Sequence, residues 1–138
     1  MRAIIKALIL QGIGGLLYLG IELLWRGHTH WTMFFMGGFC FLIVGGVNEG
    51  ISYDMLLWKQ MLLSALMITA VELEAGIILN GVYKLDVWDY SSLPFNFLGQ
   101  ICPQYTCLWF LISLPAILLD DFLRFFLFGE EKPHYRIF

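Results

Sequence analysis

Four long apolar runs divide this sequence, and they constrain its fold more than any other feature. They cover residues 4–24, 31–48, 61–83 and 101–119. An α-helix rises about 1.5 Å per residue, so each run is long enough to cross a hydrocarbon core ~30 Å thick. The sequence therefore predicts an all-α fold, a four-helix transmembrane bundle, with residues 1–138 forming a single integral membrane domain.

The composition agrees with an integral membrane protein. Hydrophobic residues make up 59% of the chain and charged residues 14%, and the mean hydropathy is +0.76. An ordinary soluble domain is about 25% charged. The formal net charge of −3, with no cluster of Lys and Arg, excludes a basic nucleic-acid-binding protein. The lipid bilayer is thus an expected partner, and nucleic acid is not.

The basic residues predict an orientation in the cell membrane. In a protein with four spans, the N-terminus, the second loop and the C-terminus share one side. That side holds six basic residues: Arg2, Lys6, Lys59, Arg124, Lys132 and Arg136. The other side holds Arg26 and Lys84. Because cytoplasmic loops carry the excess of Lys and Arg, we expect a multi-pass protein with both termini in the cytoplasm.

Glu72 lies in the middle of the third run, where a carboxylate is costly and often functional. Helical spacing puts Asn80 on the same face as Glu72, and Glu22 lies near the outer end of the first run. Small and polar residues on these faces are otherwise typical of helix–helix packing. Glu74 lies about 200° around the helix from Glu72. Either its face meets another protomer, which we favour, or Glu74 is protonated or reaches a polar cavity.

The segment 88–102 mixes turn residues with Phe and Leu before the last run. It predicts either an interfacial loop or a re-entrant piece, which is tolerated at membrane depth only where protein or water covers it. We expect Asp89 to be directed toward Glu22 or His28. Tyr90 offers a hydrogen-bond donor. Asn96 is expected to let the backbone begin the last helix close to the neighbouring helices.

Three functions fit these features. The first is an oligomeric transporter or channel component with an intramembrane carboxylate. Its candidate ion- or substrate-binding residues are Glu22, Glu72, Asn80, Asp89, Tyr90 and Asn96. The second is a membrane-embedded enzyme with an outward-facing acidic and histidine site, in which His28 and His30 are candidate metal ligands. The third is an accessory subunit of a larger membrane complex. We favour the transporter over an enzyme, and the sequence identifies no cofactor.

The sequence also resembles a known family over nearly its whole length. The motifs that carry the resemblance are Ile21–Gly27, Gly45–Glu49, Trp88–Ser91, Pro94–Asn96, Gly99–Cys102 and Gly129–Tyr135, together with Glu72, Gly76 and Asn80. These resemble the CmpB-like small membrane proteins labelled ABC-transporter permease type IV. The resemblance implies a multi-span membrane protein. The sequence has no G-x-x-x-x-G-K-[ST] phosphate loop, so an ABC role would require separate ATP-binding subunits.

Overall fold

The computed structural model describes residues 1–50 and 55–138, apart from the side chain of Asn48. Over these residues the chain forms four α-helices, α1 (Arg2–Arg26), α2 (Thr32–Gly50), α3 (Leu57–Gly76) and α4 (Pro103–Phe128). A π-helix, η1 (Ile77–Val82), continues α3 without a break. The predicted all-α, four-helix bundle is confirmed. The helices start and end within a few residues of the apolar runs, and α4 continues past residue 119 to Phe128, as the amphipathic stretch that follows the last run predicts.

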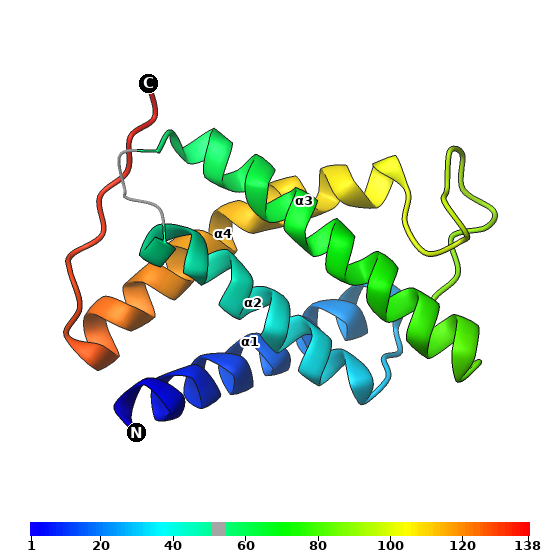
Figure 1. Cartoon of the computed structure of the whole chain (residues 1–138), viewed down its shortest axis with the longest axis horizontal. Helices are drawn as coiled ribbons and strands as arrows, with labels where there is room; N and C mark the ends of the chain where they lie inside the picture. The colour runs from blue at the N-terminus through cyan, green and yellow to red at the C-terminus, as the bar shows by residue number, and fades with distance from the viewer. Residues whose placement is uncertain (51–54) are drawn as a thin grey trace.

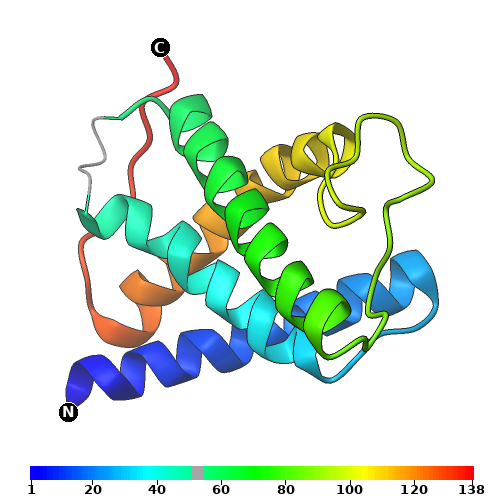
Figure 2. The same ribbon diagram turned by 45° about the vertical axis from the view of Figure 1, so that its right-hand side comes forward.

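Helix α2 lies between the other helices of the bundle. It packs along α1 and also contacts α3 and α4, which cross each other (Figures 1 and 2). Both termini lie at one end of the bundle (Figure 1). The connection between α1 and α2 and the long loop 83–102 lie at the opposite end, which we call the loop end.

Glycines allow α1 and α2 to approach closely. A Cβ on Gly38 would overlap the side chain and carbonyl of Gln11, and one on Gly15 would overlap the carbonyl of Phe34. The Gln11 amide also donates a hydrogen bond of 2.9 Å to the carbonyl of Phe35. Small residues at a helix interface permit such backbone contact, as the small and polar faces in the sequence predict.

The ends of α4 explain its length. Pro103 lies in the first turn, where its missing N–H costs nothing. At the other end Gly129 adopts a left-handed conformation with φ 65°, which ends the helix. The tail then returns along the bundle, and the N–H of Leu57 donates a 2.8 Å hydrogen bond to the carbonyl of Arg136.

Ion pairs join three helices at the terminal end. Arg124 binds Asp120 at 2.6 Å and Glu49 at 2.5 Å, and Lys6 binds Glu49 at 3.2 Å and also Glu130. Burial raises the pKa of Glu49, but the charges of Arg124 and Lys6 outweigh burial and hold that pKa below its ordinary value. This network joins α1, α2 and α4 at the terminal end of the bundle.

Two helical segments of the described chain are long and apolar enough to cross a membrane, Arg2–Arg26 and Leu57–Val82. A shorter apolar segment covers Thr32–Val47. The sequence predicted four spans, and two segments of the described residues meet this test of length and composition. The length and composition of these segments thus agree with a membrane location.

Candidate functional site

The loop 83–102 packs into the bundle. Its buried side chains include Val87, Trp88 and Tyr90, which form one hydrophobic cluster with Met33 of α2. The Trp88 indole N–H also donates a 3.0 Å hydrogen bond to the carbonyl of Gln100 within the loop. The loop therefore closes one end of the bundle, as expected of a segment that mixes turn and apolar residues.

Asn80 and Asn96 hold this loop in shape. The Asn80 carbonyl oxygen accepts the N–H of Val87 at 2.7 Å, and its amide donates to Gln100 at 2.9 Å. Asn96 accepts the N–H of Gly99 at 3.0 Å and donates to the carbonyl of Leu93 at 2.8 Å. Both of these predicted binding residues therefore form hydrogen bonds that hold the loop in its conformation. Neither one lines the pocket described next.

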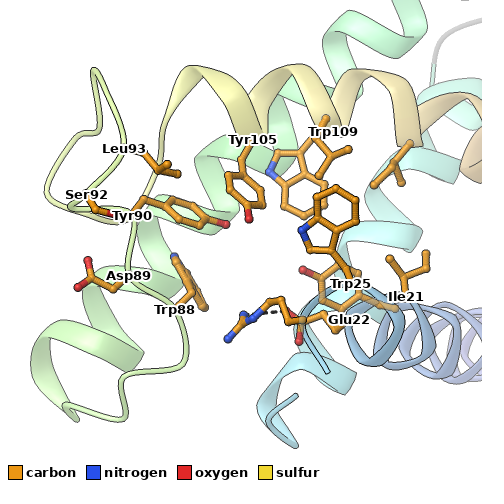
Figure 3. Close-up of a pocket in the computed structure, with 14 residues that line it drawn as sticks. Ile21, Glu22, Trp25, Trp88, Asp89, Tyr90, Ser92, Leu93, Tyr105 and Trp109 are labelled. Atoms are coloured by element: carbon orange, nitrogen blue, oxygen red, sulfur yellow. Dashed lines mark hydrogen bonds and ion pairs between the residues drawn. The ribbon is translucent and has the colours of Figure 1, made fainter. Parts of the chain in front are cut away.

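A pocket of about 310 Å³ lies between α1, α4 and the loop (Figure 3). Among the residues that the structure describes, six aromatic side chains line it: Tyr18, Trp25, Trp88, Tyr90, Tyr105 and Trp109. Tyr90 and Tyr105 stack with ring centroids 4.3 Å apart and an angle of 15° between their planes. We call this cavity the aromatic pocket.

Glu22 lies in the wall of the aromatic pocket and is almost fully buried. Its carboxylate accepts hydrogen bonds from Arg26 at 3.0 Å and from the Thr29 hydroxyl at 2.6 Å. Arg26 also donates to the carbonyl of Val87 at 2.8 Å, which ties α1 to the loop. The charge of Arg26 is therefore balanced by Glu22 within the wall.

Glu72 lies directly behind the same wall. It is 2% exposed, and it accepts hydrogen bonds from the Tyr90 hydroxyl at 2.7 Å and the Trp109 indole at 3.0 Å. Both donors line the aromatic pocket, whereas Glu72 does not. The predicted candidates Glu22 and Tyr90 thus meet at one pocket, and Glu72 contacts that pocket through Tyr90 and Trp109.

Asp89 lies at the rim of the pocket with its carboxylate exposed. We expected it to point toward Glu22 or His28. Instead, Oδ1 accepts the N–H of Ser91 at 2.9 Å, and Figure 3 shows the carboxylate turned away from Glu22. A hydrogen bond two residues along the chain satisfies an exposed carboxylate without bringing the helices closer. The hydrogen bonds from Ser91 lower the pKa of Asp89, so it is ionised at neutral pH.

The two candidate metal ligands lie in the connection between α1 and α2. His28 accepts a 3.0 Å hydrogen bond from Arg26, and His30 lies 2.7 Å from the Thr32 hydroxyl. Over residues 1–50 and 55–138, no three His, Cys, Asp or Glu side chains gather in a way that could hold a metal ion. Neither histidine lines the aromatic pocket.

Most of the aromatic wall was not predicted from the sequence. Tyr105 and Trp109 are four residues apart and therefore share a helix face, which was the available signal. Tyr18 lies four residues before Glu22 on the polar face of α1. Trp25 ends an apolar run, where tryptophan is equally typical of a membrane-interface anchor.

The fold and pocket define a helical bundle with an apolar surface and one polar, aromatic cavity. Comparison with known families gives a specific assignment. The family described as "Putative ABC-transporter type IV" matches residues 12–126. The chain belongs to this family, and the resemblance drawn from its motifs is confirmed. No solved structure matches the chain significantly.

Proposed function

We propose that this protein is a component of an oligomeric membrane transporter and that its aromatic pocket binds a small organic cation. The observation that carries this proposal is the gathering of aromatic rings and carboxylates around one cavity of about 310 Å³. The family description, which names a transporter, agrees with it.

The rings favour a cation over other ligands. The face of an aromatic ring carries negative electrostatic potential, and quaternary ammonium ligands are bound in cages of such rings. Trp25, Tyr105 and Trp109 supply rings from two helices, and Trp88 and Tyr90 supply rings from the loop (Figure 3). A cage with walls from separate elements can change shape when the elements move.

The charges favour a cation as well. Two carboxylates, Glu22 and Asp89, and one guanidinium, Arg26, belong to the described lining. Arg26 is engaged by Glu22, so Asp89 leaves a net negative charge at the rim. Glu72 adds a second effect, because the Tyr90 hydroxyl and the Trp109 indole N–H donate hydrogen bonds to it. Hydrogen bonds to a carboxylate polarise the donors and increase the electron density of their rings.

The wider proposal concerns topology and assembly. We propose that all four helices cross the cell membrane, with both termini in the cytoplasm and the aromatic pocket facing outward. Four helices leave little room for a transport path within one copy of the protein. We therefore propose that a second copy or a larger membrane partner completes the transport path. Glu74 is exposed on the outer side of α3 and marks a surface for such a contact.

Binding of tetramethylammonium tests the proposal. We expect the purified full-length protein in lipid nanodiscs to bind this ion in isothermal titration calorimetry. Trp25→Leu removes one ring and should weaken binding about 3- to 30-fold, the range of a cation–π contact. Trp58→Leu is the matched control, because Trp58 is an exposed tryptophan outside the pocket and should leave affinity unchanged.

Two results would contradict the proposal. One is the absence of tetramethylammonium binding to a folded protein. The other is equal weakening by Trp25→Leu and Trp58→Leu, which would indicate a non-specific effect. Uptake of the labelled ion into proteoliposomes then separates transport from binding alone.

A further inference from the structure

A second cavity adjoins the aromatic pocket. Its volume is about 270 Å³, and its wall is almost entirely apolar, with residues such as Val44, Ile68 and Ala116 from three helices. Residues of α1 complete the wall. We call it the apolar pocket.

The two pockets share part of their walls, and together we call them the groove. Tyr18 and Ile21 of α1 and Trp109 and Ile112 of α4 line both of them. In Figure 3, Ile21 and Trp109 lie on the side of the aromatic pocket opposite Asp89. A ligand in the groove would thus have a charged rim at one end and hydrocarbon at the other.

The size of the apolar pocket suits an alkyl chain. An engineered cavity of about 150 Å³ lined by apolar side chains binds benzene. A pocket of about 270 Å³ therefore has room for several methylene groups. A small cation bound in the aromatic pocket would make no favourable contacts with the walls of the apolar pocket.

We propose that the ligand is an amphipathic organic cation, with its quaternary ammonium group in the aromatic pocket and its alkyl chain in the apolar pocket. This inference rests on the proposed function and names the substrate class of that site. Charge complementarity selects the cation over an anionic amphiphile, because the two carboxylates of the lining, Glu22 and Asp89, outnumber its one guanidinium, Arg26. The shared residues of α1 and α4 align the two halves of the ligand.

The test compares tetramethylammonium with hexyltrimethylammonium and hexyl sulfate, by calorimetry on the full-length protein in nanodiscs with empty nanodiscs subtracted. Each buried methylene contributes about fourfold in affinity. We expect hexyltrimethylammonium to bind at least about tenfold more tightly than tetramethylammonium, and hexyl sulfate to bind far more weakly.

Variants assign the chain to the apolar pocket. Ala116→Phe fills that pocket and should remove the advantage of the hexyl chain, while tetramethylammonium affinity stays the same. Ala70→Phe is the matched control, since Ala70 is exposed on α3 and lines neither pocket. Leu119→Trp, also in the apolar pocket, gives the same test if Ala116→Phe does not fold.

The outcomes distinguish the two proposals. If tetramethylammonium binds but the hexyl chain adds nothing, the amphipathic ligand is excluded and the aromatic pocket remains a cation site. If Ala70→Phe removes the advantage as fully as Ala116→Phe, or hexyl sulfate binds as tightly as the cation, the amphipathic ligand is likewise excluded. If no cation binds, the proposed function itself is overturned.

Discussion

At the scale of single residues, Glu72 is the group whose surroundings differ most from what its sequence position suggests. A carboxylate in an apolar run could contact a ligand directly, but here it contacts two aromatic donors that line the pocket. Its role in the proposed site is therefore to position Tyr90 and Trp109 and to polarise their rings. A substitution that keeps its shape and removes its charge separates this role from packing.

We expect Glu72→Gln to fold but to bind tetramethylammonium about 3- to 10-fold more weakly, in line with the size of a cation–π contact. The glutamine amide nitrogen would face one of the two donors, so the variant should also lose about 1–3 kcal/mol of stability. Calorimetry gives the affinity and thermal unfolding gives the stability. Glu74→Gln, on the exposed side of the same helix, should change neither one. A Glu72→Gln protein with unchanged affinity would show that Glu72 does not act on the rings of the aromatic pocket.

At the scale of the helices, Arg124 joins α4 to α2 at the terminal end. Its partner Asp120 is fully buried against Gly45 of α2. Breaking a buried pair by removing one partner costs about 3–5 kcal/mol, because the other charge remains buried. We expect Arg124→Met to destabilise the protein by this amount, and Asp120→Asn with Arg124→Met to recover much of it. Denaturant unfolding of the two variants measures the difference, and equal destabilisation would contradict the buried pair.

The same network predicts a dependence on pH. The pKa of Glu49 is lowered in the folded protein, so its contribution is complete above its ordinary value of 4.5 and is lost as pH falls through the lowered value. The side chain is half exposed, so the contribution should be about 1 kcal/mol or less. Thermal unfolding between pH 7 and pH 3 should show a smaller acid loss in Glu49→Gln than in the wild type. Parallel curves for the two proteins would exclude this role.

The sequence predicted the positions of these helices well, because three of them start and end within a few residues of the apolar runs. It also placed Asp120 four residues before Arg124, which a helix converts into an ion pair. The pocket could not be predicted in the same way. Tyr90 contacts Glu72 only because the loop folds back over α3, and the orientation of Asp89 depends on one local hydrogen bond from Ser91. Periodicity carries information about faces of a helix, but not about the path of an irregular loop.

At the scale of the whole molecule, the positions of the termini bear on the proposed topology. Both lie at the end that carries the ion-pair network, opposite the aromatic pocket (Figure 1). Each helix therefore runs from one end of the bundle to the other, as a protein with four spans requires. The excess of Lys and Arg in the segments at the terminal end is the reason that the proposed topology places that end in the cytoplasm.

Cysteine labelling of intact cells tests this orientation. His28→Cys lies at the loop end and Lys132→Cys in the C-terminal tail, and both positions are exposed. We expect a membrane-impermeant maleimide to label His28→Cys from outside and to label Lys132→Cys only after the cells are opened. The unmodified chain, with Cys40, Cys102 and Cys107, gives the background signal. The reverse pattern would place the aromatic pocket on the cytoplasmic side, and labelling of both positions from outside would exclude a membrane between the two ends of the bundle.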